Sequence, residues 1–278
     1  MTAVSIPAPT SRRSPAAIVR DCAVHTWRNL VHIAREPLRL SDVTVQPILF
    51  TLLFVYVFGA GVSLPGGGSY TSYAIAGLLA FNLTTSAIGT AVGLSTDLTT
   101  GVIDRFRTLP QWPAAVLVGR SVADLMTAAV CTAIVLLTGL VVGWRPDGTV
   151  LQTVSAIGIV LLFAYAMAWV CACLGIFSKD AESAQNLGLI LLFPLSFVSN
   201  ALVPTQHMPA VLRTIADWNP VSAVTAAVRQ LFDNPNPSAT ISAWPMQHPV
   251  LASLIWSVAL IAIAAPLATV LFRRRTSD

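Results

Sequence analysis

Residues 150–177 read VLQTVSAIGIVLLFAYAMAWVCACLGIF and contain no charged side chain. An α-helix rises 1.5 Å per residue, so about 20 apolar residues cross the roughly 30 Å hydrocarbon core of a bilayer. The stretch is longer than that minimum. Its length and its lack of charge predict a transmembrane helix.

The same pattern recurs along the 278-residue chain, and Asp124 is the only formal charge inside the stretches that show it. Only helices and closed barrels satisfy their backbone groups in lipid, and the alternating ten-residue segments of a barrel strand are absent. The fold class predicted is therefore an all-α polytopic membrane protein. The six predicted transmembrane helices are Val43–Val62, Tyr73–Leu94, Val122–Val142, Val150–Phe177, Leu187–Val203 and Val250–Phe272.

The overall composition agrees with a lipid environment. Hydrophobic residues make up 55% of the chain and charged residues 10%, against roughly 25% charged residues in soluble domains. The net charge of +4 does not indicate nucleic-acid binding, because the arginines flank apolar blocks instead of forming a stripe. Cys171 and Cys173 point about 200° apart on a helix, so they cannot share a metal ion.

The basic residues predict the orientation. With both termini in the cytoplasm, 13 of the 16 basic residues lie inside. The three left outside are Arg145, Arg213 and Arg229. The positive-inside rule favours this topology, with both termini cytoplasmic.

The residues before the first span divide into two parts. Residues 1–15 are rich in Pro, Ser and Thr and are expected to be a disordered cytoplasmic tail. In residues 16–40, apolar residues recur at helical spacing with arginines among them. This pattern predicts an amphipathic helix in the cytoplasmic interface of the membrane. A merely solvated leader is the alternative. Residues 41–275 are then the transmembrane domain, and no secretory signal precedes it.

A long segment, Pro204–Gln247, separates the fifth and sixth predicted spans and is largely apolar. Pro209–Trp218 and Pro220–Phe232 are predicted to be short helices that enter the outer leaflet and return. One apolar face of the second helix is predicted to consist of Val221, Val224, Val228 and Leu231. Two further short spans are the alternative, disfavoured because each helix covers only about 15–20 Å. Arg213 with Asp217, and Arg229 with Asp233, are predicted to pair at i,i+4 spacing.

Residues for autonomous chemistry are missing. The only lysine, Lys179, is not in a phosphate-binding loop, and neither the His-Glu-x-x-His nor the Gly-x-Ser-x-Gly pattern occurs. No ionisable residue lies in the middle of a predicted span, which argues against an ion-driven pump. Asn82 and Asn200 are candidate polar residues of a transport path, although hydrogen bonding between helices explains them equally well. We therefore expect no catalytic, cofactor or metal site in this chain, and no enzyme activity of its own.

The inner loop between the second and third spans carries the most information. Residues 97–110 read DLTTGVIDRFRTLP, followed by GRSVAD at 119–124. This loop is predicted to form a short exposed helix with an apolar edge and a charged edge, the latter formed by Asp104, Arg105 and Arg107. Such a helix could bind in a groove on a partner protein. A solvated connector is the alternative. Pro110 ends this helix.

These residues resemble the membrane subunits of type II ABC exporters, especially the daunorubicin-resistance permease family. The acidic-Gly-x-x-Asp-Arg-Phe-Arg-x-Leu-Pro stretch followed by Gly-Arg-x-x-Ala-Asp identifies that family. The basic leader helix, the six spans and the short outer helices with Trp218-Asn219-Pro220 are also similar, over roughly residues 16–275.

The resemblance implies roles for matching residues. A coupling helix of Asp104, Arg105, Phe106 and Arg107 would dock on a separate ATPase dimer that holds ATP and Mg²⁺. A second permease chain, identical or a sister, would complete the path. The residues implied to support the loop are Asp97, Gly101, Leu109, Pro110, Arg120 and Asp124, and the outer gate would include Trp218, Asn219 and Pro220.

The function expected is that of a plasma-membrane permease subunit of an ATP-driven exporter, moving a hydrophobic drug-like or antibiotic-like molecule or a lipid outward. Export of a lipid-linked glycan is one alternative within the family. A scaffold or secondary carrier that needs no ATPase is the alternative from another class.

Overall fold

The computed structural model describes residues 15–59, 61, 64, 67–100 and 115–277. All regular secondary structure in these residues is helical, which confirms the all-α fold class. Five helical segments are long and apolar enough to cross a membrane. They are Leu40–Phe58, Tyr70–Thr99, Leu117–Val141, Val150–Phe177 and Pro249–Arg275.

The first span begins earlier than the sequence predicts. Helix α1 (Pro15–Arg35) ends one residue before Glu36, which is extended, and Pro37 starts helix α2 (Pro37–Leu53). A residue that precedes proline is driven out of the helical region, so the predicted helix over residues 16–40 is divided here. A π-helical turn, η1 (Phe54–Phe58), continues α2.

The second span is the centre of the bundle. Helix α3 (Tyr70–Ser86) continues through Ala87 into helix α4 (Ile88–Thr99). Thirteen of the 17 residues of α3 are buried, around its whole circumference. It contacts α2, α6 (Ala115–Val141), α7 (Val150–Phe177), α8 (Ala181–Phe197) and α10 (Pro220–Phe232). A helix apolar on all sides is thus enclosed by its neighbours.

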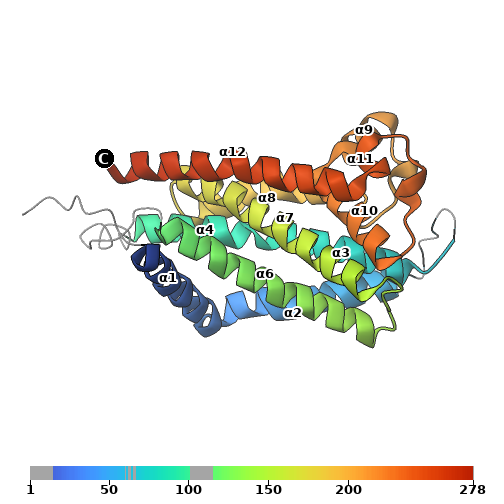
Figure 1. Ribbon diagram of the computed structural model, residues 1–278, viewed down its shortest axis with the longest axis horizontal. Coiled ribbons are helices and arrows are strands. Elements are labelled where there is room, and N and C mark those ends of the chain that lie inside the picture. Colours follow the sequence, from blue (N-terminus) through green and yellow to red (C-terminus); the bar gives the residue numbers. More distant parts are fainter. Residues whose placement is uncertain (1–14, 60, 62–63, 65–66, 101–114, 278) are drawn as a thin grey trace, which may run out of the picture.

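Helix α7 has the bounds that the sequence predicts. Thr149 and Gln152 form a capping box, in which the Thr149 N–H donates to Gln152 Oε1 at 2.8 Å. Ser178 ends the helix in an extended conformation. Helix α12 (Pro249–Ser277) packs along α7 at the edge of the bundle (Figure 1).

Helix α8 differs from the predicted fifth span, Leu187–Val203. It begins six residues earlier, where Asp180 accepts a hydrogen bond from the Ser183 N–H at 2.7 Å. It ends at Phe197, so its 17 residues span about 26 Å, slightly less than a hydrocarbon core. Residues 198–203, which the sequence predicts to be the end of this span, form a turn instead of continuing the helix.

The chain between α8 and α12 forms a compact cap at one end of the bundle (Figure 1). Helix α10 is buried and packs on α3, α7 and α12, with its predicted apolar face in the main core. The other elements of this cap are η2 (Thr205–His207), α9 (Ala210–Trp218), η3 (Pro237–Thr240) and α11 (Trp244–Gln247). Helix α1 and the C-terminal end of α12 lie at the opposite end (Figure 1).

Candidate functional site

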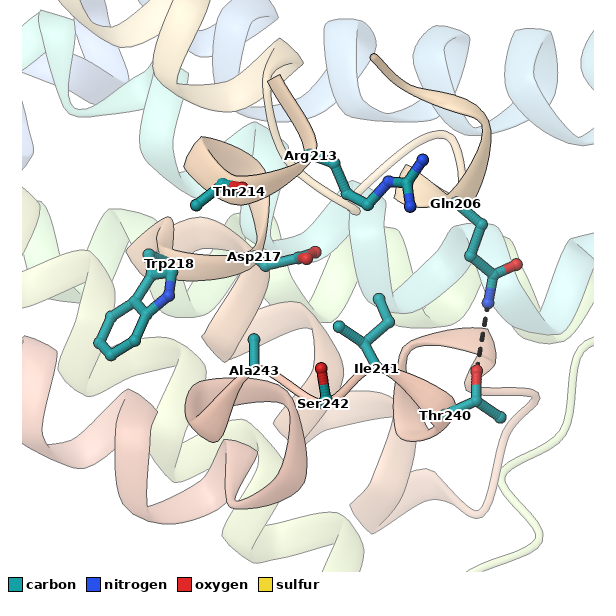
Figure 2. A pocket seen from close by; sticks show the side chains of 9 residues that line it. All are labelled: Gln206, Arg213, Thr214, Asp217, Trp218, Thr240, Ile241, Ser242 and Ala243. Atoms are coloured by element: carbon teal, nitrogen blue, oxygen red, sulfur yellow. Dashed lines mark hydrogen bonds between the residues drawn. The ribbon is translucent and has the colours of Figure 1, made fainter. Parts of the chain in front are cut away.

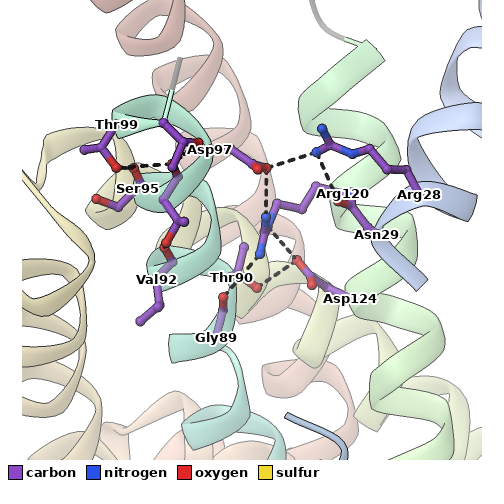
Figure 3. A network of polar contacts seen from close by, with 12 residues as sticks. Arg28, Asn29, Gly89, Thr90, Val92, Ser95, Asp97, Thr99, Arg120 and Asp124 are labelled. Atoms are coloured by element: carbon purple, nitrogen blue, oxygen red, sulfur yellow. Dashed lines mark hydrogen bonds and ion pairs between the residues drawn. The ribbon is translucent and has the colours of Figure 1, made fainter. Parts of the chain in front are cut away.

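A network of charged side chains joins three helices at the end of the bundle that holds α1 (Figure 3). Asp97 Oδ2, on α4, lies 3.1 Å from Arg28 Nη2 of α1 and 3.3 Å from Arg120 Nη1 of α6. Arg120 Nε lies 3.9 Å from Asp124 Oδ2, which also accepts a hydrogen bond from Thr90 Oγ1 at 2.8 Å. Two cations and two carboxylates therefore balance within one partly buried cluster.

Local packing puts Arg120 at the centre of this network. Gly93 lies against the Arg120 guanidinium, and a Cβ at this glycine would overlap it. Arg120 Nη2 also donates to the Gly89 carbonyl at 3.3 Å. The side chain is only 9% exposed, so its attraction to the carboxylates is weakly screened by solvent.

Helix α1 is fastened to α6 beside the network. Thr26 Oγ1 donates to the Gly119 carbonyl at 3.1 Å, and a Cβ at Gly119 would meet His25. The opposite face of α1 exposes Val24 and Trp27. The buried face of this amphipathic helix is thus a polar one, and its apolar face points away from the protein.

The network holds together the two helix ends on either side of residues 101–114. Asp97 lies near the end of α4, Arg120 lies near the beginning of α6, and the segment 101–114 joins these helices. The predicted coupling-helix residues Asp104, Arg105, Phe106 and Arg107, with Gly101, Leu109 and Pro110, lie outside the described residues. The network therefore joins α1, α4 and α6 next to the ends of this segment.

The polar candidate Asn82 lies in the buried middle of α3. Its Nδ2 donates to the Leu78 carbonyl of its own helix at 2.8 Å. The buried amide group of Asn82 thus has a hydrogen-bond partner within its own helix.

The second candidate, Asn200, belongs to a polar hub at the other end of the bundle. It lies in the turn after α8, and its carbonyl accepts hydrogen bonds from Tyr73 Oη at 2.8 Å and Arg229 Nη2 at 2.9 Å. Its own N–H donates to Ser222 Oγ and its Nδ2 to Ser238 Oγ, both at 2.9 Å. One turn is therefore bound to α3, α10 and η3.

Arg229 holds this hub together, and the predicted ion pair with Asp233 is wrong. The guanidinium is fully buried and donates to the carbonyls of Tyr73, Asn200 and Ala201 at 3.1, 2.9 and 2.9 Å. It also stacks on the Tyr73 ring, with its central carbon 3.5 Å from the ring centroid. Asp233 is exposed in a left-handed conformation that ends α10. Arg229 thus turns into the core, where backbone carbonyls replace a carboxylate.

Close packing leaves little freedom for this turn. A Cβ at Gly77 of α3 would overlap the Ala201 carbonyl. The backbone of α3 and the turn after α8 therefore touch directly, and glycine is required there.

The predicted gate residues Asn219 and Pro220 lie at the helix ends beside this turn. Asn219 Nδ2 donates to the carbonyls of Leu195 and Val198, each at 2.7 Å, and so caps the end of α8. Its Oδ1 accepts from the Val221 N–H at 2.8 Å and caps the start of α10, where Pro220 is the first helical residue. Trp218 is exposed at the end of α9.

The fold and these two polar clusters define a polytopic α-helical membrane protein. The described residues contain no group of three His, Cys, Asp or Glu side chains placed to bind a metal. Residues 20–232 match the family of ABC-2 type transporters. The chain therefore belongs to the ABC-2 type transporter family.

Similar proteins include a permease of Streptomyces coeruleorubidus described as daunorubicin resistance ABC transporter permease protein DrrB1. It is 32% identical over 96% of this chain and 90% of its own length. A probable doxorubicin resistance ABC transporter permease, DrrC of Mycobacterium tuberculosis, is 24% identical over 97% of this chain and 94% of its own length. A putative transport permease of Porphyra purpurea, ycf38, is 25% identical over 78% of this chain and 75% of its own length.

Replacing Arg120 with Gln is expected to destabilise the protein by about 2–3 kcal/mol, because it leaves Asp97 and Asp124 without their shared cation. Thermal unfolding of the purified protein measures the change. Arg145→Gln is the matched control, since Arg145 is exposed and loses only its hydrogen bonds to the Leu140 and Trp144 carbonyls, so its effect should stay within about 1 kcal/mol. Equal stability of the two variants would show that the network does not hold these helices together.

Replacing Arg229 with Met is expected to cost about 3 kcal/mol, because the turn after α8 loses three hydrogen bonds at once. Arg229→Lys should recover little, since an ammonium lacks the planar fork that reaches several carbonyls. The same unfolding measurement applies, with Arg145→Met as control. A stable Arg229→Met variant would mean that the buried charge costs more than its contacts contribute.

Proposed function

We propose that this chain is the permease subunit of an ATP-driven exporter that moves drug-like hydrophobic molecules outward across the plasma membrane. One observation carries the proposal: an apolar helical bundle whose sequence matches the ABC-2 family over most of its length. Its similarity to a daunorubicin resistance permease supports a drug as the cargo.

The topology we propose has six spans, with α8 as the fifth. Helix α8 is short, but the turn after it is sealed by Arg229 and Asn219, so its carbonyls need no water. The cap that contains α9 and α10 would then lie on the outer side as re-entrant structure. The excess of basic residues in the remaining loops supports cytoplasmic termini, as does the common location of α1 and the C-terminal end of α12.

We propose that the inner loop transmits the conformational change driven by ATP hydrolysis in a partner subunit to this chain. Asp104–Arg107 would dock on a separate ATPase subunit that binds ATP and Mg²⁺, and a second permease chain would complete the transport path. The ion-pair network supports this role because it fixes the two helices that carry the loop. Motion of the loop would then tilt α4 and α6 together.

The charges in the spans suit an apolar cargo. In the described spans the charged side chains other than Asp124, the eighth residue of Leu117–Val141, lie near span ends, and those of the network are paired with one another. A path lined by apolar and small residues favours an uncharged or amphipathic molecule over an ion.

The function is tested by uptake of a fluorescent hydrophobic drug into inside-out vesicles that contain the chain and its candidate ATPase. Uptake should require ATP and should stop when the catalytic residue of the ATPase is mutated. Uptake driven by an ion gradient without ATP would support a secondary carrier instead.

Reversing Arg105 and Arg107 to Glu should abolish co-purification with the ATPase, because the docking helix would carry the wrong charge. Arg145→Glu is the control, since Arg145 lies at the cap end and should leave the complex intact. Unchanged assembly of the double variant would refute the docking assignment while leaving the vesicle experiment able to support transport.

A further inference from the structure

A polar cavity lies in the cap, at the end of the bundle opposite the charge network (Figure 2). It is open to the surface, and its volume is about 460 Å³. Helix α9 forms one wall, and the segment between η3 and α11 forms the other. The lining residues are Gln206, Arg213, Thr214, Asp217, Trp218, Thr240, Ile241, Ser242 and Ala243.

Two opposite charges line this cavity without neutralising each other. Arg213 and Asp217 are one helical turn apart, yet the ion pairs among the described residues do not join them, contrary to the sequence prediction. Arg213 Nη2 donates to the Met208 carbonyl at 3.1 Å. Asp217 Oδ1 accepts from Thr205 Oγ1 at 3.1 Å. Each charge thus has a neutral partner of its own and faces the same space.

The carboxylate is the more constrained of the two. Asp217 is 6% exposed, and burial raises its pKa above the usual value, with the Thr205 hydrogen bond and the Arg213 charge acting in the opposite direction. Desolvation destabilises a buried carboxylate, and the Arg213 charge offsets only part of this effect at Asp217. A ligand cation that enters the cavity would remove this penalty.

An apolar stripe on α9 borders the cavity. Val211, Ile215 and Trp218 follow helical spacing and are 73, 54 and 53% exposed. A short amphipathic helix with such a stripe, at the end of a membrane-spanning bundle, is suited to the level of the lipid headgroups. Trp218 belongs to both the stripe and the cavity wall, so a ligand with a polar head and an apolar tail would contact both.

From these features we infer that the cavity binds the headgroup of a zwitterionic phospholipid with a primary ammonium, phosphatidylethanolamine. Arg213 binds the phosphate and Asp217 binds the ammonium. The hydroxyls of Thr240 and Ser242 lie on the facing wall, and the stripe on α9 packs against the upper acyl chain.

Headgroup chemistry explains the selectivity. A primary ammonium donates hydrogen bonds to a carboxylate, whereas the quaternary ammonium of phosphatidylcholine has no N–H to donate. Phosphatidylglycerol offers the phosphate to Arg213, but its net negative charge is repelled by Asp217. The two charges together therefore select a zwitterion with a donor group.

Native mass spectrometry of the purified chain tests this inference. The protein is exchanged into an equimolar mixture of phosphatidylethanolamine, phosphatidylcholine and phosphatidylglycerol with identical acyl chains. One phosphatidylethanolamine per chain should be retained about tenfold over phosphatidylcholine, the ratio expected for a charge-assisted hydrogen bond.

Substitutions at Asp217 and Arg213 test the contribution of each charge separately. Asp217→Asn keeps an acceptor for Thr205 but removes the charge, so the preference for phosphatidylethanolamine should disappear and phosphatidylglycerol should rise several-fold. Arg213→Gln should lower retention of all three lipids. Asp217→Glu, which keeps the carboxylate, should retain the preference and shows whether any loss reflects folding.

Matched controls are Asp233→Asn and Arg145→Gln, which change exposed charges outside the cavity lining and should leave lipid retention unaltered. Equal retention of phosphatidylethanolamine and phosphatidylcholine by the unmodified protein would overturn the inference. So would an Asp217→Asn variant with unchanged selectivity. Neither result would bear on ATP-dependent transport, which is measured separately.

Discussion

A protein in lipid has to satisfy every backbone polar group from within, and this constraint shapes the whole chain. Long helices meet it through their own hydrogen bonds. The turn after α8 is where a predicted apolar span stops being helical, and its carbonyls need other donors. Arg229, Tyr70, Tyr73 and Asn219 supply those donors, with Tyr70 Oη reaching the Leu202 carbonyl at 3.1 Å. The buried guanidinium of Arg229 thus donates hydrogen bonds to backbone carbonyls that the end of the helix leaves without helical partners.

The continuous helical segment formed by α3 and α4 contributes a residue to each of the two polar clusters. The segment Tyr70–Thr99 carries Tyr73 of the cap hub near one end and Asp97 of the ion-pair network near the other. Thr84 and Thr85 donate to carbonyls of the preceding turn at 2.7 and 3.0 Å, close to the junction of α3 and α4 at Ala87. Hydroxyls bound in this way bend helices slightly. A single helical segment therefore links the two clusters.

Much of this architecture was predictable from sequence because lipid imposes a simple rule on composition. The bounds of α7, the buried face of α10 and the polar, loop-adjacent positions of Asp97, Arg120 and Asp124 follow from runs of apolar residues and from the motif around the inner loop. The shift of α8 was not predictable. Hydropathy includes residues 198–203 in the span because four of the six are apolar, and it cannot report that Asn219, 21 positions after Val198, caps the helix before them.

The residues missed by sequence reasoning are those whose partners are distant in the chain. Arg28 and Thr90 complete the ion-pair network from α1 and α4, and their spacing relative to Asp97 and Asp124 carries no local signal. Arg229 and Asp233 have ideal spacing for an ion pair, yet burial of α10 turns Arg229 toward Tyr73 and leaves Asp233 at a left-handed helix end.

The sequence by itself determined that the chain is a membrane-spanning helical protein and which loop carries the family motif, because charge is expelled from lipid and apolar length sets the span. Only the tertiary structure decided which polar side chains meet. Hydrogen bonds and ion pairs act over about 3 Å between helices, and no one-dimensional pattern contains those distances.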